Sequence, residues 1–333
     1  MEDYLVLYGE RKLEDLICFL NMFPNAKKIQ IGWTKKEEEN NQKFVFSFLE
    51  NQQNIKQILF LGLETGWNKL IKTIKSTYPE IIIKVICTTL DSLLYYDYER
   101  ENFFTLLKLN KAGIVDYVAF LRKGEYELYQ TLGYSCCYLM ENYQLDDRVK
   151  KELREIEKVQ KKQIMSIGIY PLSYTWDKNI FNQLCIGKFI ENSEIRYLAL
   201  HERMQEFLET MQIANQKVEM DKINDEVLLR EIIKSDIVID CSFTAYFHPV
   251  FFMSMELGIP CLIGNQSDLF EGHEELEKYV VTNAEDNPIV NAKLVNKIRM
   301  ETEKIVILYK DWKEHHNRKA EKIKQEFLKL GRK

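Results

Sequence analysis

The chain has 333 residues and a formal net charge of −5, with 46% apolar and 29% charged residues. This composition excludes an intrinsically disordered chain, and the length predicts two domains or one large one. Basic and acidic residues number 19 and 21 up to residue 150, and 27 and 30 after it. Because neither half is basic, we expect no nucleic acid partner.

The first half alternates short apolar runs with amphipathic stretches of helix length. We expect strands over residues 4–8, 28–32, 55–63, 81–88, 114–121 and 135–139. We expect helices between them over residues 13–22, 43–51, 68–77, 93–109 and 126–132. Strands this apolar, separated by helices, are typical of a parallel α/β sheet covered on both faces. An N-terminal domain over residues 1–150 is therefore predicted.

The polar segment 142–163 interrupts this rhythm, and we interpret it as a connection between domains. A surface helix inside one domain is the alternative. The alternation then resumes, which predicts a second doubly wound domain over residues 151–305. Its expected strands span 164–170, 195–200, 218–220, 237–241, 261–264 and 279–282. Its expected helices span 179–191, 203–211, 224–234 with Asn224 as a candidate N-cap, 249–257, and a stretch opening at Asn287.

The last thirty residues contain ten Lys and Arg but four Asp and Glu, and their apolar positions fall at helical spacing. They predict a long amphipathic helix, with residues 306–333 forming a C-terminal segment. Its basic face has two interpretations, a solvated surface or a contact with a membrane surface or polyanion. Both stay open at this point.

Seven cysteines are scattered along the chain without a Cys-x-x-Cys pair, which favours free thiols in a reducing cytoplasm. No apolar run approaches about 18 residues and the N-terminus has no basic region, so we expect neither a membrane span nor a signal peptide. Dinucleotide and Walker fingerprints are missing, as are Cys/His clusters with metal spacing. We expect no metal and no cofactor. The abundance of Lys, Asn, Ile and Glu favours a bacterial source.

Residues that follow predicted strands are the candidate site residues, because ligands of open α/β sheets bind beyond the carboxyl ends of strands. Gly9 permits close approach of the backbone to a ligand, or belongs to an ordinary turn. Asp91 is either a carboxylate in a cleft or the N-cap of the next helix. Lys178 and Asn179 lie where a helix begins, which is a plausible anion site. Lys178 as a merely solvated lysine is the alternative.

The segment 237–265 is the most informative part of the sequence. It consists of a strand, a loop containing Ser242 and Thr244, a short helix ended by Gly258, and a second strand. The hydroxyl groups and the helix N-terminus could hold phosphate. His248 precedes that helix, either as a packed or capping side chain or as a catalytic base.

This segment resembles the C-terminal signature of GT-B glycosyltransferases, especially family four (group 1), whose members retain the anomeric configuration. Ser242, Gly258 and Pro260 match that pattern, as do residues 261–264, and residues 176–179 match the place where the family has a diphosphate-binding lysine. The family's E-x7-E pair would fall on Ala245 and Met253, which is a departure. Glu256 lies on nearly the same helix face as Met253 and is the nearest substitute.

The resemblance implies two Rossmann-like domains of GT-B type, with the C-terminal helix packing back toward an acceptor-side N-terminal domain. It implies transfer of a sugar from a nucleotide-sugar donor, without a metal, to a glycan, lipid-linked or protein acceptor. Asp91 and His248 are then the catalytic candidates, and the donor-binding candidates are Gly9, Lys178, Asn179, Ser242, Phe243, Thr244, Ala245, Met253 and Glu256.

The missing glutamates leave a second interpretation open, an inactive GT-B-like protein that binds or stabilises an active transferase. A sugar-nucleotide epimerase is a third. Homo- or hetero-oligomers and a contact with the inner face of the membrane fit each of these functions.

Overall fold

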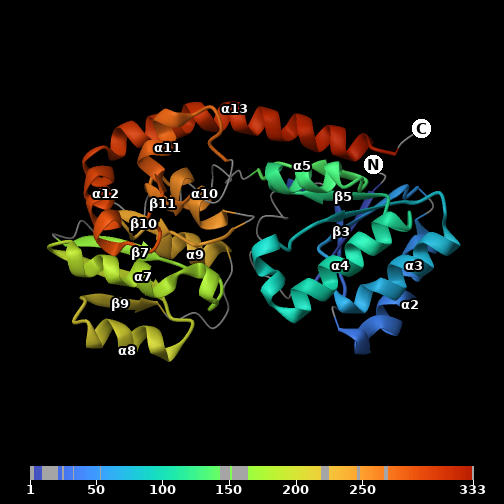
Figure 1. The fold of residues 1–333 in the computed structure, drawn as a ribbon, viewed down its shortest axis with the longest axis horizontal. Helices are drawn as coiled ribbons and strands as arrows, with labels where there is room; N and C mark the ends of the chain where they lie inside the picture. Colours follow the sequence, from blue (N-terminus) through green and yellow to red (C-terminus); the bar gives the residue numbers. More distant parts are fainter. Residues whose placement is uncertain are drawn as a thin grey trace. The chain divides into compact units, whose positions relative to one another are not determined.

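The computed structural model describes residues 4–9, 22–24, 26–32, 34–52, 54–142, 151, 164–218, 225–245, 248–265 and 269–331. The chain divides into two compact units, unit 1 with residues 1–142 and 318–333, and unit 2 with residues 143–317. Each unit contains one six-stranded sheet, and the strands within each sheet pair in parallel (Figure 1). The predicted α/β fold with two doubly wound sheets and a long C-terminal helix is confirmed. Three predictions fall wholly or mostly outside the described residues. They are the helix 13–22 up to residue 21, the connection 142–163 except residues 142 and 151, and the N-cap at Asn224.

Unit 1 has the strand order β2-β1-β3-β4-β5-β6, so the direction of winding changes between β1 and β3. Its strands are β1 (Tyr4–Tyr8), β2 (Lys27–Gln30), β3 (Gln57–Leu61), β4 (Ile82–Ile86), β5 (Tyr117–Phe120) and β6 (Cys136–Tyr138). Its helices are η1 (Lys35–Glu37), α2 (Glu38–Asn51), η2 (Thr65–Trp67), α3 (Asn68–Thr77), η3 (Asp91–Tyr95), α4 (Asp97–Lys111) and α5 (Lys123–Thr131). Apolar side chains of α2, α3 and α4 pack with one face of the sheet in a single core cluster.

The other face of this sheet receives the end of α13 (Thr302–Lys329). Lys84 on β4 is 0% exposed, and its Nζ donates a hydrogen bond to the carbonyl oxygen of Phe327 at 2.5 Å. Gln57 on β3 donates to the carbonyl oxygen of Leu328 at 2.9 Å. The last carbonyls of a helix have no partner inside the helix and attract positive charge. Two buried strand side chains therefore bind the C-terminal end of α13 to unit 1.

Unit 2 has the strand order β12-β11-β10-β7-β8-β9, in which the winding direction changes between β7 and β10. Its strands are β7 (Met165–Ile169), β8 (Ser193–Leu198), β9 (Asn215–Val218), β10 (Ile237–Asp240), β11 (Cys261–Gly264) and β12 (Val281–Thr282). Its helices before α13 are η4 (Trp176–Lys178), α7 (Ile180–Cys185), η5 (Ile186–Phe189), α8 (Glu202–Thr210), α9 (Asp225–Ile232), α10 (Pro249–Glu256), α11 (Glu274–Val280) and α12 (Pro288–Met300).

Two predicted strands of unit 2 are partly wrong. The strand expected over residues 218–220 is β9, which spans Asn215–Val218. Residues 279–280 end α11, and only Val281 and Thr282 form β12. The helix has seven residues, of which Leu276, Tyr279 and Val280 are buried. Two turns are too short for a helical period to stand out, and the β-branched and aromatic residues at the end favour a strand.

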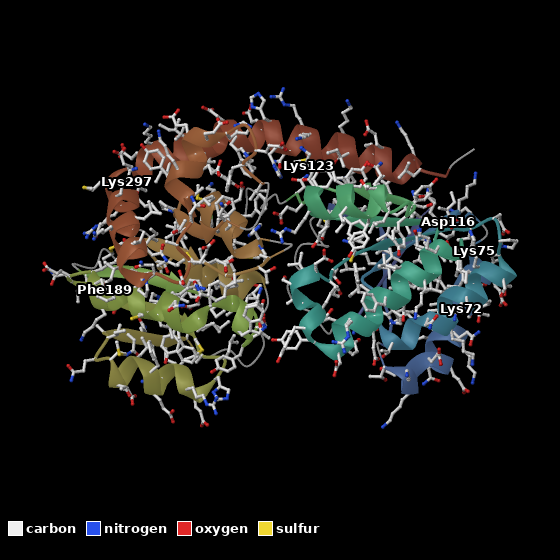
Figure 2. The ribbon with its side chains drawn as sticks, in the orientation of Figure 1. Lys72, Lys75, Asp116, Lys123, Phe189 and Lys297 are labelled. Atoms are coloured by element: carbon white, nitrogen blue, oxygen red, sulfur yellow. The ribbon has the colours of Figure 1, made fainter. Side chains whose placement is uncertain are left out.

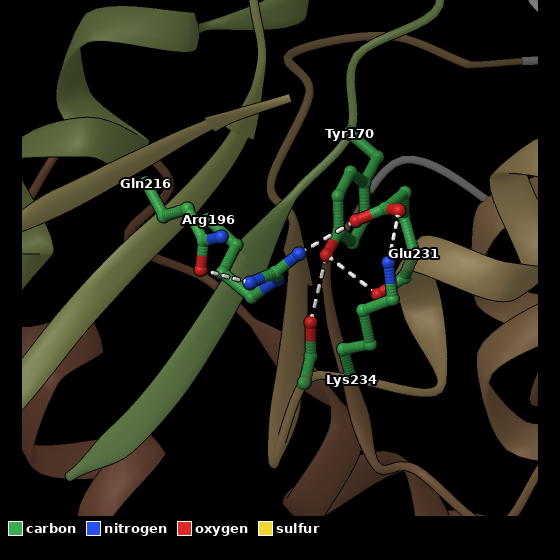
Figure 3. Close-up of polar contacts among 6 residues, drawn as sticks. Tyr170, Arg196, Gln216, Glu231 and Lys234 are labelled. Atoms are coloured by element: carbon green, nitrogen blue, oxygen red, sulfur yellow. Dashed lines mark hydrogen bonds and ion pairs between the residues drawn. The ribbon is translucent and has the colours of Figure 1, made fainter. Parts of the chain in front are cut away.

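A polar network built around the buried Tyr170 and Arg196 joins β7, β8 and α9 (Figure 3). Arg196 on β8 donates to the Glu231 carboxylate at 2.6 Å and also to the side chain of Gln216, and Lys234 pairs with the same carboxylate. The hydroxyl of Tyr170, directly after β7, donates to the carbonyl oxygen of Glu231 at 3.0 Å. The network therefore ties the end of β7, where the chain enters the candidate site, to the end of α9.

This network makes stability depend on pH. Burial raises the pKa of Glu231, but hydrogen bonds and charge from Lys234 and Arg196 outweigh it, so the pKa lies below its usual value. The ion pair therefore adds stability above the unfolded-state pKa near 4.5, and loses it as the pH falls through the lower folded pKa. We expect Glu231→Gln to cost about 3 kcal/mol at pH 7, since it leaves Arg196 without its carboxylate, and clearly less near pH 3.

Urea unfolding from pH 3 to pH 7 measures this difference. Glu226→Gln is the matched control, because Glu226 forms an exposed pair with Arg230 on the same helix and should change stability by less than about 0.5 kcal/mol. A difference in unfolding free energy between wild type and Glu231→Gln that stays constant over this pH range would contradict the stabilising role of the Glu231 ion pair.

Candidate functional site

The candidate site lies at the carboxyl ends of β7 and β10, the strands between which the winding of unit 2 changes direction. Open α/β sheets bind ligands at this point because the loops from the two strands diverge there and leave a crevice. The loop after β7 leads through η4 into α7, and the loop after β10 leads to α10. These are the loops that contain most of the predicted site residues.

Two sets of hydrogen bonds hold these loops together. The backbone N–H of Phe243 donates to the carbonyl oxygen of Asp177 at 2.6 Å. The Asn179 amide donates to the carbonyl oxygens of Cys241 at 2.9 Å and Glu285 at 2.7 Å. Asn179 has φ 53°, a left-handed conformation that asparagine tolerates better than most residues. The structure thus brings Lys178 and Asn179 into one assembly with the loop after β10.

The polar side chains of this assembly are buried. Lys178, Ser242 and Thr244 are each less than a tenth exposed. Ser242 Oγ donates to Asp240 Oδ1 at 2.8 Å, which fixes the first hydroxyl of the loop. An ammonium group and two hydroxyl groups close to a helix N-terminus are the groups that bind phosphate in proteins. The arrangement suits a phosphate or diphosphate ligand.

His248 is the N-cap residue of α10 and is buried, but its side chain makes no capping hydrogen bond to the described residues of that helix. The expectation of a packed or capping histidine therefore agrees with its burial and its position. Cys241 directly follows β10 and Cys261 begins β11, and burial raises the pKa of both thiols well above the usual value. Both cysteines stay protonated at neutral pH and are poor nucleophiles.

Three donor-binding candidates lie at or within α10. Ala245 is buried just before the helix, and Met253 is 0% exposed within it. Glu256 is buried too, and its Oε1 accepts a hydrogen bond from the Tyr309 hydroxyl at 2.8 Å and pairs with Lys313, both on α13. The apolar surroundings of Met253 and the bonds of Glu256 direct these side chains into the protein interior.

Gly9 and Asp91 belong to unit 1. Gly9 directly follows β1, next to the point where the winding of that sheet changes direction. Asp91 is the first residue of η3 and Leu90 its N-cap, so the N-cap interpretation of Asp91 is wrong. The exposed Asp91 carboxylate accepts a hydrogen bond from the Tyr129 hydroxyl at 2.9 Å. Burial, followed by this bond, raises the pKa of Tyr129.

A pocket of about 420 Å³, not predicted from the sequence, lies beside Lys178. Polar and apolar side chains of η4, α7 and the loop after β10 line it, namely Tyr174, Thr175, Trp176, Asn179, Ile180, Phe181, Asn182 and Phe243. Trp176 precedes the buried Asp177, and Phe243 lies between the buried Ser242 and Thr244. Large aromatic residues next to polar residues in loops that follow strands are the signal that could have identified the pocket. Among the described residues, no group of three or more His, Cys, Asp or Glu could hold a metal ion. No helix in the described ranges is long and apolar enough to cross a bilayer.

Comparison with known proteins shows a likeness in structure but not in sequence. No protein-family model and no curated protein matches the sequence. HepE from Anabaena, solved in complex with UDP, shares 11% identity over 98% of this chain and 98% of its own, with a TM-score of 0.66. The UDP-forming α,α-trehalose-phosphate synthase from Burkholderia xenovorans shares 9% identity over 98% of both chains, with a TM-score of 0.66.

WaaG, a glycosyltransferase involved in lipopolysaccharide biosynthesis, shares 9% identity over 98% of this chain and 99% of its own, with a TM-score of 0.61. At these identities the likeness concerns the fold alone, and it extends over nearly the whole chain. The chain therefore has the two-domain GT-B fold that these glycosyltransferases share.

Proposed function

We propose that the protein is a glycosyltransferase that binds a nucleotide-sugar donor at the carboxyl ends of β7 and β10. The observation that carries this proposal is the assembly of Lys178, Ser242 and Thr244 on two loops bonded to each other, the second of which leads to α10. The GT-B fold supports it, because HepE of the same fold has been solved with UDP and with UDP-glucose.

The chemistry follows from where charge develops during transfer. The bond between the anomeric carbon and the diphosphate oxygen breaks, and the electron pair of that bond stays on the diphosphate. The Lys178 ammonium and the first N–H groups of α10 stabilise this negative charge, which is largest in the transition state. An acceptor hydroxyl forms the new bond to carbon and loses its proton. Positive charge supplied by the protein in this way requires no metal at the phosphate.

The resemblance to family four adds retention of the anomeric configuration to this proposal. It also assigns the acceptor to unit 1, where Gly9 and Asp91 follow β1 and β4. Asp91 and His248 are the two candidates for accepting the hydroxyl proton. A glycan, lipid-linked or protein acceptor fits this chemistry equally, since each offers a hydroxyl group.

A second candidate function has an observation of its own. Ala245 and Met253 stand where family four has two glutamates, and Glu256 is bonded to α13. This favours a protein that keeps the fold and binds or stabilises an active transferase.

Thermal unfolding and donor hydrolysis, measured on the full chain with UDP-, GDP- and dTDP-sugars, test the two functions. A transferase is expected to be stabilised by one nucleotide class, by about 2.7 kcal/mol at 100 times Kd, and to release its sugar. No response to any nucleotide sugar would contradict transferase activity and support the binding partner.

A further inference from the structure

Exposed aromatic side chains line the pocket beside Lys178. The binding of phosphate that we propose for the site does not require them. Trp176 is 53% exposed and Phe243 is 38% exposed, although Asp177 next to Trp176 and both neighbours of Phe243 are buried. Their ring centroids are 6.2 Å apart and the ring planes meet at 32°. Large aromatic side chains bury surface wherever they can, so two neighbouring exposed rings indicate a surface that a ligand covers.

The loops hold these two rings in a fixed position. Trp176 belongs to η4, whose next residue, Asp177, accepts the 2.6 Å hydrogen bond from the Phe243 backbone. Asn179, one turn on, is bonded to the carbonyl oxygens of Cys241 and Glu285. A rigid platform binds a ring with little loss of side-chain entropy, which is the advantage of a preformed site.

The rim of the pocket supplies polar groups without charge. The Asn182 amide nitrogen donates to Asn179 Oδ1 at 2.6 Å, and no hydrogen bond to Asn182 Oδ1 is formed by the described residues. Thr175 contributes an exposed hydroxyl group. All eight lining residues are uncharged. The pocket therefore suits a neutral ligand with one apolar face and hydroxyl groups around its edge.

We infer that this pocket binds a saccharide ring, with the C–H face of the ring against Trp176 and Phe243 and its hydroxyl groups toward Thr175 and Asn182. The electron-rich face of an aromatic ring attracts the weakly positive C–H groups of the sugar. The volume of about 420 Å³ is sufficient for one sugar ring and part of a second. The inference rests on the proposed function for the source of the ring, which is either the donor sugar or the acceptor.

Ligand binding by exposed-residue variants tests the inference, and folding is not at risk because the rings are on the surface. Calorimetry with UDP and UDP-glucose, and saturation-transfer NMR with maltose, lactose and cellobiose, would be run on wild type, Trp176→Ala, Phe243→Ala and Trp176→Phe. The matched control is Phe189→Ala, which removes a ring that is 45% exposed on η5 and is not part of the pocket (Figure 2).

We expect about tenfold weaker binding of the sugar-bearing ligand to Trp176→Ala, partial recovery in Trp176→Phe, and no change in Phe189→Ala.

Weaker binding of UDP-glucose but not of UDP identifies the donor sugar, and weaker binding of a free disaccharide identifies the acceptor. Equal weakening of UDP binding would overturn the inference, because Trp176 would then contact the nucleotide base and not a sugar ring. Unchanged or absent binding of every saccharide-bearing probe would overturn it too. If disaccharides bind through Trp176 but no nucleotide binds to the wild type, the proposed function fails and the saccharide pocket stands.

Discussion

Lys178→Ala is expected to lower the turnover of the nucleotide-sugar donor by about 10²- to 10³-fold. That is the usual effect of removing one group that is held in place to stabilise charge developing in a transition state. The side chain is buried next to the loop that contains Ser242 and Thr244, so water cannot simply replace the ammonium group. Steady-state kinetics with the donor identified by the nucleotide-sugar panel would measure kcat and KM separately.

The kinetic pattern distinguishes the possible roles of Lys178. A loss confined to kcat and kcat/KM indicates an interaction made in the transition state, whereas a rise in KM alone indicates uniform binding of the donor. Lys188→Ala is the matched control, since Lys188 is an exposed lysine of the same unit whose Nζ donates to the Met211 carbonyl oxygen. Equal kinetics for Lys178→Ala and Lys188→Ala would remove Lys178 from the site.

Lys84→Ala is expected to destabilise the protein by about 3–4 kcal/mol. The substitution removes a fully buried side chain, leaves a cavity between β4 and α13, and removes the shorter of two hydrogen bonds to the Phe327 carbonyl oxygen, which keeps the 3.2 Å bond from the Leu330 N–H. Lys84→Met should cost less, because it fills the same space and removes a charge that is expensive to bury. Denaturant unfolding gives the free energies, and hydrogen exchange shows whether the amides of residues 318–331 lose protection first.

An exposed lysine of unit 1 is the control for this prediction. Lys72 lies on α3 and is exposed, so Lys72→Ala should change the unfolding free energy by less than about 0.5 kcal/mol (Figure 2). Exchange at residues 318–331 that is the same in Lys84→Ala and in wild type would contradict the assigned role of Lys84.

The fold was predictable because parallel strands are buried on both faces. Runs such as Ile237–Asp240 and Cys261–Gly264 are apolar without alternation, and the structure has them as β10 and β11. Short elements were not predictable to the same extent. The stretch Glu274–Val280 forms a two-turn helix in which tertiary packing of Leu276 and Tyr279 outweighs the preference of its last residues for a strand.

The candidate site was predictable as far as strand ends locate it. Lys178, Ser242 and Thr244 were identified because they follow β7 and β10, and the structure brings their loops together. Long-range bonds were not predictable, since nothing local indicates that Asn179 bonds to the carbonyl oxygen of Glu285. The direction of the Glu256 side chain is another such case, because it depends on α13, more than fifty residues later in the chain.

The binding of the end of α13 by Lys84 and Gln57 has a consequence for how the protein is made. Residues 318–331 complete unit 1, yet they are synthesised after every strand of unit 2. The nascent unit 1 therefore lacks the end of α13 until unit 2 has been made, and only then can Lys84 and Gln57 bind the carbonyl oxygens of Phe327 and Leu328. An early stop codon would leave unit 2 whole but unit 1 unfinished, with an apolar surface that chaperones and proteases recognise.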